Sequence, residues 1–451
     1  MLGTSVPWDT QFDVKTSSDL KRTTTLSRRS ALAMHQASPY RDKTDAQTST
    51  EPSFYSDEID RFAAMEQQPV TLQRLLQICE PPLTREKLLE NAQYLCRERP
   101  VRYAKRVKLF QQLPFIVNLN PHINAVYQSY YANFEESRRF ACVETLTDER
   151  QFIKMLAHQS KLLRDIMPQI ARGFYECRNY FKPDERRRFL DQLIKMRIGL
   201  RLLTSQHIAL YDQYQAATTD RAASASASAS AAPLAPITTS LVSARPNDSD
   251  SDETRHQGII DNRLHLADMV HVCAQSVQAM CDMSFGDSPT FVVDGQTDIV
   301  FRYIPSHLDY MLTELLKNAF RASLKCVEGT DRAIPPVFIT ISKGDNRVAI
   351  RIRDCGGGIP SQIHEQVFDY SFTTTTHGSI DEDAGGASTD GSAHPVDTHA
   401  ISGLGFGLPM TKIYAEYFGG MLNIISLEDY GCDAFLELPS IKLNRTPTIQ
   451  I

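Results

Sequence analysis

The sequence lacks several features that mark particular classes of protein. Its 451 residues include a single tryptophan, Trp8, and no apolar run approaches the ~18 residues that a membrane-spanning helix needs. The nine cysteines form no Cys-x-x-Cys pair, which argues against zinc ribbons and disulfide frameworks and favours a reducing compartment. Lysine and arginine total 48 against 54 acidic residues, which is not the basic balance of a dedicated nucleic-acid-binding protein. These absences predict a soluble protein with no membrane span and no nucleic-acid partner.

The N-terminal residues, 1–53, are rich in serine and threonine and contain no long apolar stretch. Mitochondrial transit segments are rich in arginine and serine but poor in acids, whereas Asp9, Asp13 and Asp19 occur here. Composition therefore leaves two alternatives open for this segment, a transit peptide or a plain disordered tail.

Residues 54–215 read as long helices joined by short loops, which predicts an N-terminal all-α helical bundle. Within 160–178 the apolar residues recur at the spacing of one helical face: Leu163, Ile166, Met167, Ile170 and Phe174. An alanine and serine repeat with prolines and an acidic run follows. Because such a composition buries little apolar surface, we expect 216–258 to be a disordered insertion.

The C-terminal part, 259–451, mixes helical and strand patterns. We expect two helices, at 308–322 and from near Leu408, and four strands, at 337–342, 348–353, 421–427 and 432–438. Elements in this order predict an α+β sandwich, a sheet with helices on one face.

Three polar motifs lie on these elements. The helix carries Glu314, Lys317, Asn318 and Arg321 on one side, a pattern that by itself also fits an ordinary surface helix. The second strand ends in Asp354-Cys-Gly-Gly-Gly358, and three glycines would let the backbone approach a flat ligand closely. Downstream, Ser402-Gly-Leu-Gly-Phe-Gly-Leu-Pro409 runs into a helix, and glycine amides at a helix N-terminus suit phosphates.

In this order the motifs resemble the ATP-binding boxes of the GHKL ATPase/kinase superfamily, whose ATP-binding domain has the Bergerat fold. Within it, the sequence is most similar to the mitochondrial 2-oxo acid dehydrogenase kinases. The similarity rests on Glu314-Leu-Leu-Lys-Asn-Ala-Phe-Arg-Ala322, Val367-Phe-Asp-Tyr-Ser-Phe-Thr-Thr374 and Gly405-Phe-Gly-Leu-Pro409. Pro100-Val-Arg-Tyr-Ala104 and Arg197-Ile-Gly-Leu-Arg201 extend it into the helical half. It covers roughly 54–215 and 259–451 and is strongest with the branched-chain member.

The resemblance implies roles for individual residues. Glu314 would be the base for a substrate serine, Asn318 the protein ligand of Mg²⁺, and Asp354 the acceptor of the adenine amino group. Other residues would bind ATP, partly through a lid at 373–407: Lys317, Arg321, Gly358, Thr373, Thr374, Gly403, Gly405, Phe406, Gly407 and Leu408. A K⁺ ion would lie near Val367, Asp369, Phe372, Ser402 and Gly405. Arg197 and Arg201 would bind a regulatory keto acid, although two salt-bridged arginines of a bundle fit the same spacing.

The resemblance also implies a function. The protein would be a homodimeric, ATP-dependent serine kinase of the mitochondrial matrix that phosphorylates and inactivates the decarboxylase subunit of a 2-oxo acid dehydrogenase complex. The lipoyl domain of the dihydrolipoyl acyltransferase would anchor it through the helical region. The missing C-terminal Asp-Trp signature of the pyruvate-directed kinases favours the branched-chain complex. The alternatives are a pyruvate dehydrogenase kinase, or a nucleotide-binding scaffold with weak or no kinase activity. A two-component histidine kinase is disfavoured, because the only His-acid pair, His364-Glu365, lies downstream of Asp354.

The sequence departs from the family at three positions. Leu163 stands where a family histidine contacts the catalytic glutamate, and the nearest histidine, His158, lies too far around a helix to replace it. This change would leave Glu314 less well oriented. Cys355 replaces an arginine, and Ser402 replaces a histidine.

Overall fold

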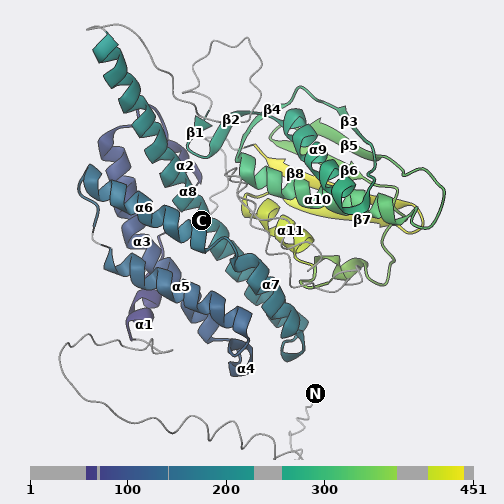
Figure 1. Ribbon diagram of the computed structural model, residues 1–451, viewed down its shortest axis with the longest axis horizontal. Helices are drawn as coiled ribbons and strands as arrows, with labels where there is room; N and C mark the ends of the chain where they lie inside the picture. Colours follow the sequence, from purple (N-terminus) through teal and green to yellow (C-terminus); the bar gives the residue numbers. More distant parts are fainter. Residues whose placement is uncertain (1–56, 69–71, 141, 228–255, 373–404, 441–451) are drawn as a thin grey trace, which may run out of the picture. The chain divides into compact units, whose positions relative to one another are not determined.

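A helical region precedes a mixed α/β region in the computed structural model, which describes residues 57–68, 72–140, 142–227, 256–372 and 405–440. The predicted N-terminal helical bundle is confirmed (Figure 1). Its helices are α1 (Asp57–Ala64), α2 (Leu72–Ile78), α3 (Arg85–Gln111), α4 (Phe115–Asn118), α5 (Pro121–Arg139), α6 (Leu146–Leu162), α7 (Ile166–Glu176) and α8 (Pro183–Ala227).

Polar residues just before several of these helices fix where they begin. The hydroxyl of Thr84 accepts a hydrogen bond from the Lys87 amide at the start of α3. Thr145 and Asp148 form a reciprocal capping box at the start of α6. Such caps satisfy backbone donors that have no partner within the helix.

The single helical face predicted over 160–178 is wrong, because the helix is interrupted. α6 ends at Leu162, Leu163 is its C-cap, and α7 begins only at Ile166. The Leu163 carbonyl accepts a hydrogen bond from Arg197 Nη1 at 3.1 Å. A basic side chain on a terminal carbonyl stabilises a helix end, so a residue distant in sequence helps to close α6 here.

The insertion predicted over 216–258 differs from the structure at both of its edges. Helix α8 continues to Ala227, and strand β1 (His256–Gln257) begins before residue 258. Alanine has the highest helix propensity of all residues, so the alanine and serine repeat can prolong α8. The rest of the predicted insertion, 228–255, and the N-terminal segment 1–53 lie outside the described residues.

The α/β region contains two sheets. The smaller has the order β1-β2-β4, with β2 (Ile260–His265) and β4 (Val300–Tyr303). The larger has the order β3-β5-β6-β8-β7 and is antiparallel except for the β3–β5 pair. Its strands are β3 (Phe291–Gly295), β5 (Val337–Lys343), β6 (Arg347–Arg353), β7 (Met421–Leu427) and β8 (Gly431–Pro439). The four predicted strands are thus found as β5, β6, β7 and β8, while β1, β2, β3 and β4 were missed.

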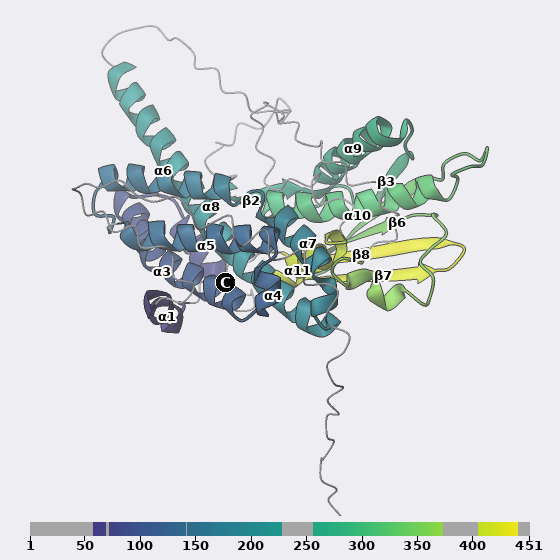
Figure 2. The ribbon, with the colours of Figure 1, turned by 60° about the horizontal axis from the view of Figure 1, so that its bottom comes forward.

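Helices α9 (Leu266–Phe285), α10 (Pro305–Lys325) and α11 (Gly407–Tyr417) cover one face of the larger sheet (Figure 2). The strands alternate accordingly, and in β6 Val348, Ile350 and Ile352 point inward and are buried. This arrangement confirms the predicted α+β sandwich. Most of the buried apolar side chains of both regions form one continuous core, and α8 packs against α11.

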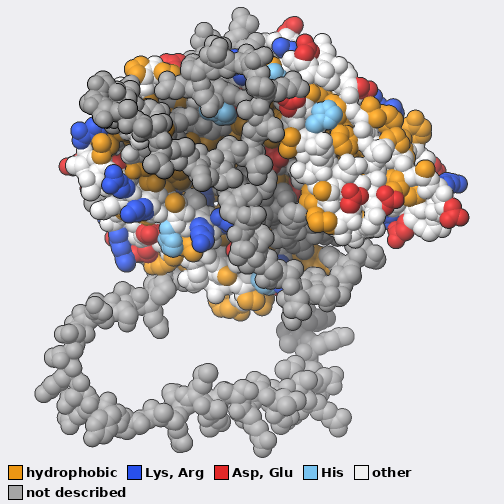
Figure 3. All heavy atoms as spheres, turned by 45° about the horizontal axis from the view of Figure 1, so that its top comes forward, with side chains coloured by type: hydrophobic (Ala, Val, Ile, Leu, Met, Phe, Trp, Pro, Cys, Tyr) orange, Lys and Arg blue, Asp and Glu red, His pale blue; other side chains and the backbone are white. Residues whose placement is uncertain are grey.

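Two expectations about the chain as a whole can be compared with the structure. All nine cysteines are free thiols. Within the ranges given above, no helix combines the length and the apolarity that crossing a membrane requires. Lysine and arginine side chains are interspersed with acidic ones on the face shown in Figure 3.

Candidate active site

Helix α10 brings its polar stripe to the mouth of a pocket while its other side enters the core. Leu308, Leu312 and Leu316 are fully buried, and this burial fixes the rotation of the helix. Glu314, in contrast to an ordinary surface residue, is only 8% exposed. Burying an ionised carboxylate costs free energy unless a partner compensates for it, and strongly buried acids are often found at functional sites.

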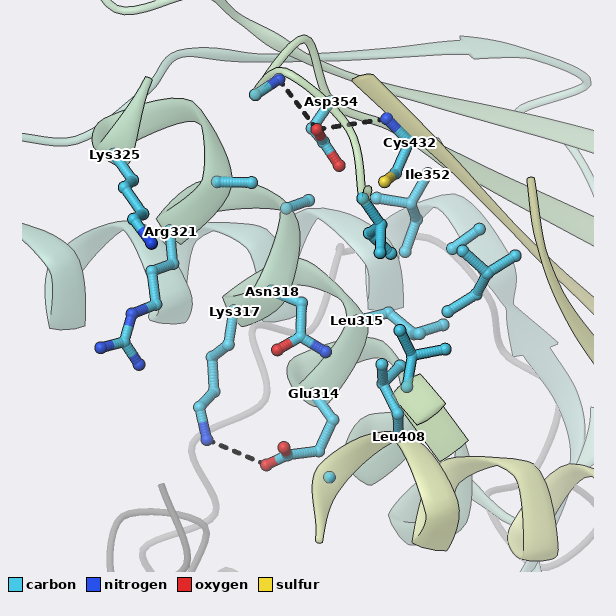
Figure 4. Close-up of a pocket in the computed structure, with 18 of the residues that line it drawn as sticks. Glu314, Leu315, Lys317, Asn318, Arg321, Lys325, Ile352, Asp354, Leu408 and Cys432 are labelled. Atoms are coloured by element: carbon cyan, nitrogen blue, oxygen red, sulfur yellow. Dashed lines mark hydrogen bonds and ion pairs between the residues drawn. The ribbon is translucent and has the colours of Figure 1, made fainter. Parts of the chain in front are cut away.

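Two neighbours hold the Glu314 carboxylate in place. Lys317 Nζ lies 2.9 Å from Glu314 Oε1, one turn along the same helix (Figure 4). On the other side is Gly407, the first residue of α11, where an added Cβ would overlap with Glu314 Oε2. A side chain at 407 would force the Glu314 carboxylate to move, so glycine here lets α11 lie close to the observed position of this carboxylate.

Asp354 lies directly after β6 at the opposite end of the pocket and is buried. Its Oδ1 accepts hydrogen bonds from the backbone amides of Gly356, at 2.9 Å, and Cys432, at 3.4 Å. Burial raises the pKa of this carboxyl, and the two amide bonds oppose the rise. Because both amides bind Oδ1, the second oxygen stays available to a ligand (Figure 4).

Two of the three glycines after Asp354, Gly356 and Gly358, are packed closely against neighbouring backbone, and both also line the pocket. A Cβ at Gly356 would overlap with the backbone of Ala322 in α10. One at Gly358, whose φ is +74°, would overlap with the Leu427 carbonyl of β7. Only Gly357 faces open space. These glycines let the loop sit tightly between α10 and β7, which places Asp354.

The pocket has a volume of about 670 Å³, within the range of ~300–1,000 Å³ that is usual for small-molecule sites. It collects most of the predicted site residues: Glu314, Lys317, Asn318, Arg321, Asp354, Gly358, Val367, Phe372, Gly405, Gly407 and Leu408. Two other predicted residues do not line it: Asp369 forms an ion pair with Arg187, and Phe406 is fully buried. Thr373, Thr374, Ser402 and Gly403 lie outside the described residues.

Sequence reasoning missed part of the wall. Cys432 and Ala434, on the inward face of β8, and Ile424 of β7 line the pocket, and the Cys432 amide donates to Asp354. Val277, Met280 and Ser284 come from α9, a helix that was not predicted. The strand alternation in 432–438 could have singled out Cys432 and Ala434, whereas nothing in the sequence of α9 relates it to a pocket.

The predicted regulatory arginines lie on α8 and are half-buried, and Arg201 lies near Tyr414 of α11 and His307 of α10. Arg197 donates to the Leu163 carbonyl. Nearby Arg106 is fully buried and donates to the Met196 carbonyl, and burial lowers the pKa of both Arg106 and Arg201. Several guanidinium groups thus share one buried neighbourhood, which favours an anion.

Comparisons with known proteins cover both regions of the chain. Residues 69–261 match the family model for mitochondrial branched-chain alpha-ketoacid dehydrogenase kinase. Residues 303–442 match the model for histidine kinase-, DNA gyrase B- and HSP90-like ATPases. Both matches agree with the regions observed in the structure.

Three mitochondrial relatives are similar along most of the chain. The pyruvate dehydrogenase (acetyl-transferring) kinase of Arabidopsis thaliana is 28% identical over 399 residues, covering 88% of this chain and 97% of the relative. Kinase 1 of Saccharomyces cerevisiae is 27% identical, with 84% and 86% covered. Isozyme 3 of Homo sapiens is 25% identical, with 85% and 86% covered.

The matrix location implied by the sequence agrees with these relatives, all of which are mitochondrial kinases. The two family models follow each other in the order of the two regions of the structure, and the second provides an ATP-binding domain. The chain therefore belongs to the mitochondrial 2-oxo acid dehydrogenase kinases of the GHKL superfamily, and it is an ATP-using protein-serine/threonine kinase.

Proposed function

We propose that this kinase phosphorylates a serine of the decarboxylase subunit of the pyruvate dehydrogenase complex. The relatives named above, which extend along most of the chain, are all pyruvate dehydrogenase kinases, whereas the branched-chain family model matches 69–261 only. These comparisons favour the alternative over the branched-chain substrate that the sequence first suggested.

The observation that supports phosphoryl transfer is a single pocket with a buried glutamate at one end and a buried aspartate at the other. Asp354 would accept the adenine amino group, and it would disfavour guanine because two acceptors would then face each other. Glu314 would take the proton of the attacking serine hydroxyl, and Lys317 would lie near the phosphates. Arg321 and Leu408 would complete the nucleotide site.

Mg²⁺ would neutralise phosphate charge during transfer. Among the described residues no group of three or more His, Cys, Asp and Glu side chains could hold a metal by itself. The exposed Asn318 amide lies in the pocket (Figure 4), and Mg²⁺ needs few protein ligands when phosphates and waters supply the others. The residues present therefore fit this ion.

A K⁺ ion is proposed near Val367, Asp369, Phe372 and Gly405. The hydroxyl of Ser371 is buried there with no hydrogen-bond partner among the described residues, so an oxygen is available. The Asp369 carboxylate pairs with Arg187, which leaves backbone carbonyls as the other ligands. Loss of catalytic rate on replacing K⁺ by Na⁺ would test this site.

Arg197 and Arg201 are proposed to bind a small anionic regulator, of the 2-oxo acid class that the family implies. The buried guanidinium groups around them support this role. A rise in Tm with added pyruvate or 2-oxoisocaproate, lost in Arg197→Gln, would measure it.

The substrate can be decided with two purified complexes. We expect transfer of phosphate from ATP to the pyruvate decarboxylase subunit to be at least ~10-fold faster, as kcat/KM, than transfer to the branched-chain subunit, which corresponds to ~1.4 kcal/mol. Faster transfer to the branched-chain subunit would overturn the proposal that the pyruvate decarboxylase subunit is the substrate. No transfer to either would favour the scaffold alternative. Calorimetric titration with each complex's lipoyl domain would test the proposed anchor.

We also propose that two copies associate through the outer face of β7, the edge strand of the larger sheet. Ile425 and Leu427 are 61% and 64% exposed on that face, and such an apolar row can pair with itself about a two-fold axis. Sedimentation of the full chain should show a dimer at micromolar concentration. The double substitution of Ile425 and Leu427 by Glu should yield a folded monomer, while Lys343→Glu, exposed on β5, should leave the dimer intact. A monomeric unmodified chain would contradict this proposal.

A further inference from the structure

The helical region contacts the segment beside the nucleotide pocket through two polar interactions, and one of them, through Tyr370, has no part in the predicted roles. The hydroxyl of Tyr370 donates a hydrogen bond of 2.6 Å to Asp191 Oδ1 of α8. One residue earlier, Asp369 forms an ion pair with Arg187, one turn before Asp191 on the same helix. The segment that follows the 3₁₀ helix η3 (His364–Phe368) is therefore bound to α8 at two successive residues.

Tyr370 passes this link on to the catalytic end of the pocket. Its side chain is 2% exposed, and its ring lies 5.0 Å from that of Phe406. Phe406 is the N-cap of α11, and the next residue, Gly407, lies against Glu314 Oε2. A continuous series of contacts thus leads from α8 to Glu314, through Asp191, Tyr370, Phe406 and Gly407.

The backbone around Tyr370 is held in an unusual conformation. Ser371 has a φ of +65°, which is uncommon for a residue other than glycine. Its amide donates to the Gly405 carbonyl at 3.2 Å, and the Phe372 amide donates to the Asp369 carbonyl at 3.2 Å. Because Phe372 and Gly405 line the pocket, a shift of Tyr370 would change the pocket wall.

We propose that Asp191 is a positioning residue for the nucleotide pocket and acts through the Tyr370 hydroxyl. The Asp191 carboxylate can only accept, so at 2.6 Å the Tyr370 hydroxyl is the donor of this bond. The same helix carries Arg197 and Arg201, so this link also joins their neighbourhood to the site of ATP. The inference rests on the proposed function only in taking ATP as the ligand of the pocket.

ATP affinity of the full chain, measured by calorimetry with Mg²⁺, tests the link without any protein substrate. Tyr370→Phe keeps the ring on Phe406 and removes only the hydroxyl. Its Kd for ATP should rise about tenfold, at the low end for loss of a hydrogen bond to a charged group. Tyr303→Phe is the matched control, since its hydroxyl is buried without a hydrogen-bond partner among the described residues, and its Kd should not change.

Variants of Asp191 distinguish a role in positioning the pocket from a role in stabilising the fold alone. Asp191→Ala should weaken ATP binding as much as Tyr370→Phe, and the double variant no more than either one, because both remove the same bond. Asp191→Asn retains an acceptor oxygen and should restore most of the affinity. Thermal unfolding without nucleotide provides the check on folding.

The outcomes are distinct. A folded Tyr370→Phe protein with unchanged Kd for ATP would overturn the inference and leave the link a stabilising contact. Additive effects of Asp191→Ala and Tyr370→Phe would also overturn it, since they would then act separately. If neither complex is phosphorylated, the proposed substrate is refuted, but these ATP-binding results are unaffected.

Discussion

Asp354→Ala is expected to abolish ATP binding, with a rise in Kd of at least ~100-fold, or ~2.7 kcal/mol. The variant removes the only carboxylate proposed for the adenine amino group and leaves the Gly356 and Cys432 amides without their acceptor. Unpaired buried donors carry a desolvation cost in addition to the lost contact. Calorimetric titration with ATP and Mg²⁺ measures the change.

A matched control for this variant is Asp345→Ala, which removes an exposed acid from the turn between β5 and β6. It should bind ATP as the unmodified chain does. Because burial raises the pKa of Asp354, ATP affinity should fall on acidification at a higher pH than an ordinary aspartate would produce, since the protonated group no longer offers a carboxylate. Undiminished ATP affinity in Asp354→Ala would show that adenine binds elsewhere.

Glu314→Gln should retain ATP affinity and lose at least ~100-fold in kcat for phosphate transfer, the low end for a general base. The amide keeps the shape of the side chain beside Gly407 and can still accept from Lys317, so the pocket should be unchanged while the proton acceptor is gone. Transfer to the decarboxylase subunit and calorimetric ATP titration measure the two effects separately.

Glu328→Gln, an exposed acid just beyond α10, provides the control and should keep full turnover. Unchanged turnover in Glu314→Gln would mean that another group accepts the proton.

The structure also bears on the family histidine that Leu163 replaces. The Glu314 carboxylate has a partner on its own helix, Lys317, and the Leu163 carbonyl accepts from Arg197 at the end of α6.

The sequence alone was sufficient for the elements with strong local patterns. The alternation in 337–353 and 421–438 and the apolar face of α10 predict elements that the structure contains, with ends that differ by a few residues. The polar motifs also fall where the patterns place them, on α10, after β6 and at the start of α11. Local periodicity determines such elements because each buries one face against a common core.

Other features could not be read from the chain because they depend on contacts between distant residues. The end of α6 involves Arg197, and the role of Gly407 becomes apparent only once α11 lies beside Glu314. Glycines 356 and 358 suggested a ligand, and only the structure shows that they also accommodate α10 and β7. Helix α9, with its weakly patterned sequence, gained its role as a pocket wall only through packing on α10.

The sequence by itself determined the order of the two regions and the residue types of the nucleotide site, because both are encoded in local patterns and short motifs. Tertiary structure alone decided which oxygen of Asp354 stays available, that Glu314 is buried, and that Asp191 reaches Tyr370 across the two regions. Burial and hydrogen bonding between segments far apart in the sequence follow from how helices and sheet pack together, and no local pattern records that packing.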